Sequence, residues 1–122
     1  MTGFRGRHHT IDYVELTVPD LDRARRFYAD AFGWQFTDYG PEYAGFRFPG
    51  DDRESGGLRL DTRVPGPGGP LVLLFSTDLD RTVAAVEAAG GEVAEGPYPF
   101  PGGRRFHFRD PSGNELGAWS ET

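Results

Sequence analysis

Hydrophobic and polar residues alternate along residues 11–18, and this period of two predicts a half-buried β-strand. Asp20 follows as the expected N-cap of a helix. Apolar residues then recur at helical spacing, as Leu21, Ala24, Phe27, Tyr28, Ala31 and Phe32. Gly33 is expected to end this helix. Three further strand-like runs follow at residues 34–39, 43–48 and 57–61.

The same order of elements begins again after residues 61–70, whose glycines and prolines are typical of a linker. Residues 70–76 predict a strand, Asp78 a helix cap, and residues 79–89 a second helix that ends at Gly90 and Gly91. Short strands are expected at residues 92–94, 104–109 and 114–120. We therefore divide the chain into a flexible tail (1–10) and one domain (11–122), made of module one (11–61), a linker (62–69) and module two (70–122).

An internal repeat supports this division. The sequence Asp-Leu-Asp-Arg that starts at Asp20 recurs at Asp78, an offset of 58 (78 minus 20). At this offset two pairs of strand residues and the closing glycines also align: Val14 with Val72, Leu16 with Leu74, and Gly33 with Gly91. Two unrelated strand–helix units could share four residues by chance. A duplication is favoured because the cap, the helix length and the closing glycine agree at one offset.

Composition narrows the classes of function. The 122 residues suit a single domain, and 37% hydrophobic with 14% aromatic residues suffice for a packed core. The net charge of -6 argues against a nucleic-acid-binding surface, which would need a basic stripe. All thirteen basic residues are arginine, which excludes a catalytic lysine, and the absence of cysteine excludes thiolate chemistry and disulfides. No apolar run approaches the roughly 18 residues of a membrane span, and no signal peptide is evident, so we expect a cytoplasmic protein without membrane partners.

Two segments resemble a known family. The opening IDYVELTVPDLDRARRFYADAFGW and the closing RFHFRDPSGNELGAW are similar to the vicinal oxygen chelate superfamily, which includes glyoxalase I, bleomycin-resistance proteins and extradiol dioxygenases. The resemblance implies an α+β fold of two tandem βαβββ modules forming a concave mixed sheet, with the helices on its outer face. It does not fix the reaction, because this scaffold hosts several chemistries.

Metal-dependent members of the superfamily hold a divalent ion with four inward side chains. Carried onto this chain by motif spacing, three of these positions are Tyr13, Leu71 and Gly117, and the repeat offset places the fourth at Arg59. Leucine and glycine side chains offer no donor, and a guanidinium repels a cation. We therefore expect no metal and no other cofactor. The alternative is a shifted metal site that uses Glu15, His107 or Glu115.

Strand alternation predicts which side chains line the concave cavity. On the face opposite the helices we expect a ligand-binding set with an apolar wall, aromatic rings and a few ionisable groups: Tyr13, Arg59, Leu71, Phe75, Glu115 and Trp119. Arg59 could hold an anionic oxygen of the ligand. Alternatively, Arg59 forms an internal ion pair with Glu15 or Asp61, and this spacing alone does not decide between the two roles.

Two residues are candidates for catalysis. His107 alternates with Phe106 and Phe108, so it faces the cavity if those rings face the helices, where it could act as a general base. Glu15 shares the concave face and is a second candidate base. The plainer interpretation of each is a side chain that is simply hydrogen-bonded to its neighbours.

These features predict a small-molecule-binding protein that takes an organic, anionic or aromatic ligand in its concave cavity without the classical metal. The alternative is an enzyme of the lyase, isomerase or dioxygenase type that uses Glu15, His107 and Arg59, with or without a metal at a non-standard site. Many relatives are dimers, some with the cavity between chains, and we expect a homodimer.

Overall fold

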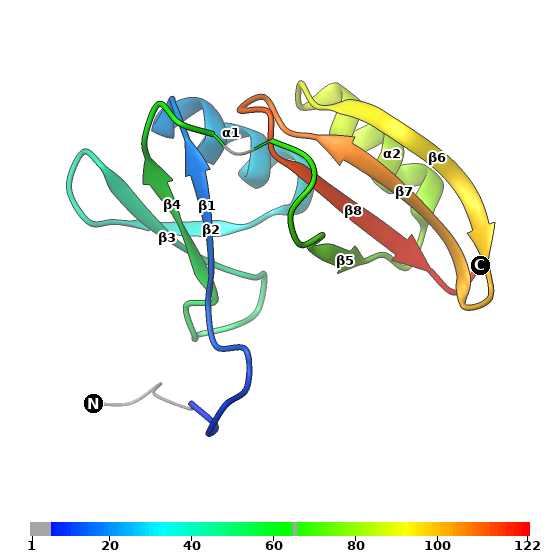
Figure 1. Ribbon diagram of the computed structural model, residues 1–122, viewed down its shortest axis with the longest axis horizontal. Helices are drawn as coiled ribbons and strands as arrows, with labels where there is room; N and C mark the ends of the chain where they lie inside the picture. Colours follow the sequence, from blue (N-terminus) through cyan, green and yellow to red (C-terminus); the bar gives the residue numbers. More distant parts are fainter. Residues whose placement is uncertain (1–5, 65) are drawn as a thin grey trace.

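Two βαβββ units follow one another along the chain. The computed structural model describes residues 6–64 and 66–122 (Figure 1). Module one contains β1 (Val14–Val18), α1 (Leu21–Phe32), β2 (Gln35–Asp38), β3 (Tyr43–Arg47) and β4 (Gly56–Leu60). Module two contains β5 (Leu73–Phe75), α2 (Leu79–Ala88), β6 (Glu92–Phe100), β7 (Gly103–Arg109) and β8 (Glu115–Ser120). The predicted order of elements is confirmed. Of the predicted flexible tail (1–10), residues 1–5 lie outside the described residues, and its flexibility stays a prediction.

Both helices begin as the sequence predicts. The Asp20 carboxylate accepts a hydrogen bond from the Arg23 amide at 3.0 Å, and Asp78 accepts one from the Arg81 amide at 3.2 Å. Helix α1 ends at Gly33, whose φ of 74° is the left-handed conformation that glycine adopts without steric cost. No helix among the described residues is both long and apolar enough to cross a membrane.

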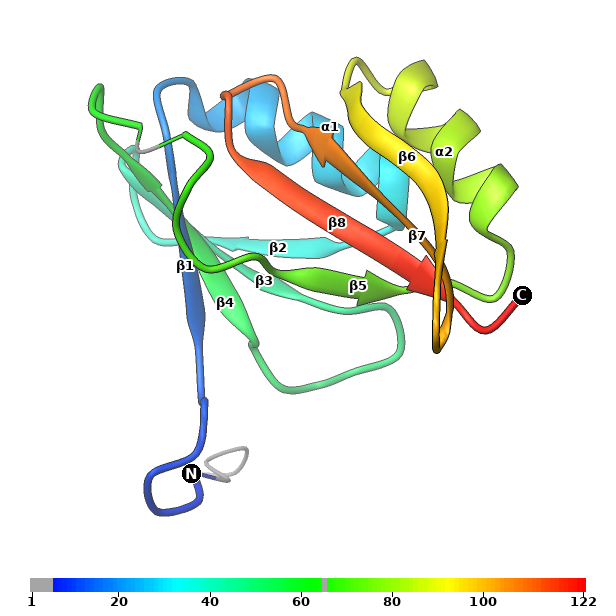
Figure 2. The same ribbon diagram turned by 45° about the vertical axis from the view of Figure 1, so that its right-hand side comes forward.

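Each module forms its own four-stranded mixed sheet. The strand order is β1-β4-β3-β2 in module one and β5-β8-β7-β6 in module two. The first strand of each module pairs in parallel with its last strand, and the other pairings are antiparallel. This is the α+β fold of two βαβββ modules that the sequence predicts. Figure 2 shows α1 running between the two sheets and α2 beside the strands of module two.

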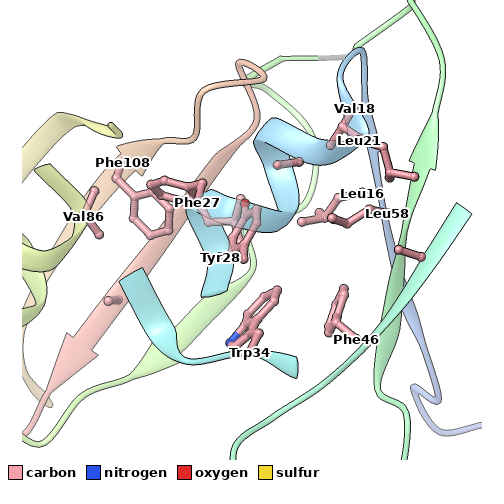
Figure 3. Packing of buried hydrophobic residues seen from close by; sticks show 14 of the residues in the cluster. Leu16, Val18, Leu21, Phe27, Tyr28, Trp34, Phe46, Leu58, Val86 and Phe108 are labelled. Atoms are coloured by element: carbon pink, nitrogen blue, oxygen red, sulfur yellow. The ribbon is translucent and has the colours of Figure 1, made fainter. Parts of the chain in front are cut away.

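One apolar core joins the modules. The ring of Phe27, on α1, lies 6.1 Å from that of Phe108 on β7 (Figure 3). The fully buried Tyr28 hydroxyl donates to Asp110 Oδ2 at 2.7 Å, and the Asn114 amide donates to the Thr17 carbonyl at 2.8 Å. Burial raises the pKa of both Tyr28 and Asp110. Helix α1 of module one is therefore fixed to the β7–β8 turn of module two.

Strand β6 is longer than the sequence predicts. Its predicted extent was residues 92–94, but it continues to Phe100 through Pro97 and Pro99, with register irregularities on either side of Glu95. Proline lacks an amide proton, yet an edge strand tolerates it because one side of the strand has no pairing partner. The extension brings Tyr98 and Phe100 onto the sheet of module two.

Candidate functional site

Each sheet has one face covered by a helix and one face without such cover. On the covered faces, side chains such as Leu16, Leu58, Phe106 and Leu116 are buried. We call the opposite surfaces the module-one face and the module-two face. The module-one face carries Tyr13, Glu15, Thr17, Tyr43, Glu54 and Arg59. The module-two face carries Leu73, Phe75, Tyr98, Phe100, Arg105, His107, Glu115 and Trp119.

Hydrogen bonds between phenols and carboxylates connect the module-one face. Tyr13 and Tyr39 donate to the two oxygens of Glu54, both at 2.8 Å, and Tyr43 donates to Glu15 at 2.8 Å. Partial burial, aided by these contacts, raises the pKa of Tyr13 and Tyr43, and the bond to Glu54 raises that of Tyr39. The acidic groups of this face are therefore engaged with neighbouring hydroxyls.

Arg59 also has partners on the module-one face. Its Nη1 lies 3.3 Å from Asp61 Oδ2, its Nε lies 4.0 Å from Glu15 Oε1, and its Nη2 donates to the Thr17 hydroxyl at 3.2 Å. These are the internal ion pairs that stood as the alternative for Arg59. The hydrogen bond from the Arg63 amide lowers the pKa of Asp61, and the positive charges of Arg63 and Arg59 lower it further. Binding of a ligand by Arg59 stays a prediction.

The strand registers correct the position assigned to Arg59 in the repeat. Gly117 pairs with Leu73, whose counterpart 58 residues earlier is Glu15, and Glu15 pairs with Gly57. The module-one counterpart of Gly117 is therefore Gly57. The offset of 58 fails here because the connections between the strands differ in length between the modules. Arg59 instead corresponds to Trp119, since each is two residues further along its strand.

The side chains at the four family positions do not fit a divalent metal. Gly57 and Gly117 carry no donor, and their space is taken: a Cβ at Gly57 would collide with the Tyr43 hydroxyl, and one at Gly117 would lie 2.7 Å from a Leu73 methyl. Leu71 is apolar. The Tyr13 hydroxyl is bound to Glu54. Within residues 6–64 and 66–122, no three His, Cys, Asp or Glu side chains are grouped to hold a metal ion.

A cross-strand row of aromatic and cationic side chains crosses the module-two face. Phe75 pairs with Trp119, Trp119 with Arg105, and Arg105 with Tyr98. The rings of Phe75 and Trp119 meet edge to face, with centroids 5.0 Å apart, and Phe75 is 56% exposed. Aromatic side chains of this size are normally withdrawn from water. The row therefore forms a largely aromatic surface in which Phe75 is exposed to solvent.

His107 lies beside this row and has three hydrogen-bond partners. Its Nδ1 lies 2.9 Å from Glu115 Oε2, and its Nε2 lies 2.9 Å from the Tyr98 hydroxyl and 3.3 Å from Arg105 Nη2. An arginine can only donate, so Nε2 accepts, and Nδ1 carries the proton that is donated to Glu115. These contacts fix the orientation of the His107 ring on the module-two face.

The predicted site residues fall into two groups. Tyr13, Glu15 and Arg59 meet on the module-one face, whereas His107 and Glu115 meet on the module-two face beside Phe75 and Trp119. Leu71 precedes β5, and its side chain approaches Gly117. In the part of the chain that the structure describes, no hydrogen bond or ion pair joins His107 to Glu15 or Arg59.

Sequence reasoning missed Tyr98 and Arg105. Arg105 could have been found, because it lies two residues before His107 on the same strand and therefore on the same face. Tyr98 could not, because the prolines around it indicate a loop.

An apolar cleft lies along the outer edge of β5. It has a volume of about 420 Å³ and is lined by Phe32, Trp34, Phe48, Pro49, Val72, Leu73, Leu74 and Phe75. Phe75 therefore borders both this cleft and the module-two face. The cleft offers apolar contacts, while the polar groups that could orient a ligand lie on the module-two face.

The sequence is similar to those of known proteins. A sequence model of the glyoxalase/bleomycin resistance protein/dioxygenase superfamily matches residues 10–117. An uncharacterized protein of Mycolicibacterium smegmatis is 32% identical over 111 residues, which cover 88% of this chain and 90% of that protein.

Two solved structures are similar across nearly their whole length. TnmS3, an antibiotic binding protein from Streptomyces sp. CB03234, is 26% identical with a TM-score of 0.71, covering 97% of this chain and all of that one. A glyoxalase/bleomycin resistance protein/dioxygenase family enzyme from Burkholderia phytofirmans PsJN is 18% identical, with a TM-score of 0.76, and the match covers 92% of this chain and 98% of that one. At this identity the likeness shows the fold alone. With its two βαβββ modules and a family match over most of its length, the chain belongs to the glyoxalase/bleomycin resistance protein/dioxygenase superfamily.

Proposed function

We propose that this protein binds a small, planar aromatic molecule on its module-two face without the classical metal of the superfamily. The observation that carries the proposal is the row of Phe75, Trp119, Arg105 and Tyr98 across β5, β8, β7 and β6. Aromatic side chains beside a few fixed polar groups are the usual lining of a small-molecule site. A planar ligand can stack on the rings while its polar atoms reach the side chains next to them.

Two further observations support this function. On the module-one face the carboxylates of Glu54 and Glu15 accept hydrogen bonds from tyrosine hydroxyls, and Arg59 pairs with Asp61, so this face offers fewer unused groups to a ligand. TnmS3, which is 26% identical to this chain, is an antibiotic binding protein, and this favours a binding role for the shared fold.

The test is a screen of melting temperature against aromatic acids, α-keto acids and antibiotics, since a ligand that binds only the folded protein raises its melting temperature. We expect planar aromatic compounds to give the largest shifts. In the Phe75→Ala variant the affinity for such compounds should fall about tenfold or more, because the most exposed ring of the row is lost. The matched control is Ile11→Ala, which removes a side chain that is 91% exposed and distant in sequence from the row. Equal affinity in wild type and Phe75→Ala would contradict the proposal.

A second candidate function is an enzyme that uses acid–base chemistry. The chain of contacts from Glu115 through His107 to Tyr98 favours it, because a carboxylate that orients an imidazole next to a hydroxyl is a common arrangement for proton transfer. These groups would act in place of the predicted set of Glu15, His107 and Arg59. Mass spectrometry of a bound ligand after prolonged incubation distinguishes the two functions: a binding protein returns the ligand unchanged, and an enzyme converts it.

A homodimer and a cytoplasmic location remain part of the proposal. The exposed Leu73 and Phe75, at 39% and 56%, are side chains that a second copy could cover. Sedimentation with and without ligand measures the oligomeric state directly. A monomer in both conditions would contradict the proposed homodimer.

A further inference from the structure

Arg105 is held between two aromatic rings on the module-two face. Its guanidinium carbon lies 5.8 Å from the ring centroid of Tyr98 and 5.8 Å from that of Phe100. A cation over an aromatic face is attracted by the negative potential of the ring, and the planar guanidinium suits this contact well. The two rings therefore fix the position of the charge without neutralising it.

The charge of Arg105 has no carboxylate partner among the described residues. Its Nε is buried without a hydrogen-bond partner among those residues, and its Nη2 donates to His107 Nε2 at 3.3 Å. A guanidinium has five N–H donors, so most of its capacity is unused. Guanidinium N–H groups that lack an acceptor in the protein have the capacity to bind an anionic oxygen.

The neighbouring carboxylate is occupied elsewhere. Glu115 accepts the Nδ1 proton of His107 at 2.9 Å and lies beyond ion-pair distance of Arg105. By contrast Arg104, the preceding residue on β7, points to the other side of the sheet and pairs with Asp80 at 3.4 Å. Of these two consecutive arginines, Arg104 has a carboxylate partner, whereas Arg105 lies on the module-two face without one.

We propose that Arg105 is an anion-binding residue that holds the carboxylate of a planar aromatic ligand. The proposal rests on the proposed function, because the ring of the ligand stacks on Trp119 and contacts Phe75, whose plane is inclined by 70° to that of Trp119. Trp119 and Arg105 are directly paired across adjacent strands, and such strands lie roughly 4.8 Å apart. That spacing suits a carboxylate attached directly to the ring. A single unpaired guanidinium matches one negative charge, and its fork of donors binds both oxygens of a carboxylate.

The test uses two probes of the same shape, 2-naphthoate and its neutral analogue 2-naphthamide, in calorimetric titrations at neutral pH. We expect wild type to bind the naphthoate about tenfold or more tightly than the amide, because charge-assisted hydrogen bonds are the stronger ones. Arg105→Met should abolish this preference and leave the affinity for the amide within a few-fold. The matched control Arg104→Met removes the neighbouring guanidinium and should keep the preference.

Three outcomes are decisive. Loss of the preference in Arg105→Met alone supports the proposal. If wild type binds both probes equally, or if Arg105→Met keeps the preference, the role of Arg105 is wrong while the aromatic binding function stands. If neither probe binds, both proposals are contradicted.

A variant that keeps the charge provides the test if Arg105→Met does not fold. Should Arg105→Met lose its circular dichroism spectrum, Arg105→Lys carries the test, because an ammonium group keeps the charge but not the two-pronged geometry. A several-fold loss of affinity for the naphthoate, with the amide unaffected, supports the proposal. Unchanged affinity for both probes contradicts it.

Discussion

The module-one face and the module-two face are built from equivalent strands, yet they use their charges in opposite ways. On the module-one face, two carboxylates accept hydrogen bonds from three tyrosines, and Arg59 pairs with Asp61 and Glu15. On the module-two face, the Glu115 carboxylate is bound to His107, and Arg105 is left between aromatic rings. The first face satisfies its own polar groups, while the second has a cation without a carboxylate partner in the chain described and an exposed ring, Phe75.

Glycines explain part of this difference. Gly57 and Gly45 are paired on neighbouring strands of module one, and Tyr43 and Glu54 lie in the space that their side chains would take. At the equivalent place in module two, Gly117 pairs with His107. Gly45 thus leaves room for the Glu54 side chain, whereas His107, at the equivalent place in module two, contacts Tyr98 and Arg105.

The largest expected effect on stability comes from breaking the hydrogen bond between Tyr28 and Asp110, which joins the two modules. Asp110→Ala removes the acceptor of the buried Tyr28 hydroxyl and of the backbone amides of Ser112 and Asn114. We expect a loss of about 3 kcal/mol in unfolding free energy, since a buried donor without a partner is expensive. Urea unfolding measures it, and should show a single transition. A loss below about 0.5 kcal/mol, within the range of surface substitutions, would mean that the modules do not depend on this bond.

A smaller effect is expected from Gly57→Ala on the module-one face. The new methyl group would displace the Tyr43 ring and break its bond to Glu15. We expect a cost of about 1–2 kcal/mol from this overpacking. Gly69→Ala is the control, because a Cβ at Gly69 has no atom within 4 Å. Equal stabilities of the two variants in urea would show that the network on this face does not require the glycine.

The smallest expected effect is a loss of folding stability at alkaline pH. The pKa values of Tyr13, Tyr39 and Tyr43 are raised above the value of 10.0 for a free tyrosine. Because the folded pKa exceeds the unfolded one, the stability from these groups is complete below pH 10 and is lost as pH rises through the folded values.

Phenolate absorbance tests this directly. The folded protein should ionise fewer tyrosines just above pH 10 than the urea-unfolded chain does, and Glu54→Gln should reduce the difference by removing the carboxylate charge beside Tyr13 and Tyr39. Identical titration curves for folded and unfolded protein would contradict the network.

The fold could be predicted from the sequence because its signals are local. Helix caps at Asp20 and Asp78, apolar periodicity and the repeat together specify two strand–helix units. The site was harder because it depends on registers between strands. An offset that is correct for the helices is wrong by two residues at Gly57, since the connecting loops differ in length.

Tertiary pairing also overrides local signals in module two. The prolines around Tyr98 indicate a loop, but pairing with β7 extends the strand through them. Whether Arg59 or Arg105 is paired cannot be read from spacing, because their partners come from residues that only the fold brings close. Alternation alone does place His107 and Arg105 on one face.

The central claim, that the module-two face is the ligand-binding surface, is tested most directly by the two tryptophan indole N–H signals in a heteronuclear NMR titration with 2-naphthoate. Trp119 belongs to the module-two face, whereas Trp34 is 6% exposed and lines the cleft beside β5. We predict a saturable shift of the Trp119 signal with little change at Trp34. A shift at Trp34 alone, or changes confined to the amides of the module-one face, would contradict the claim.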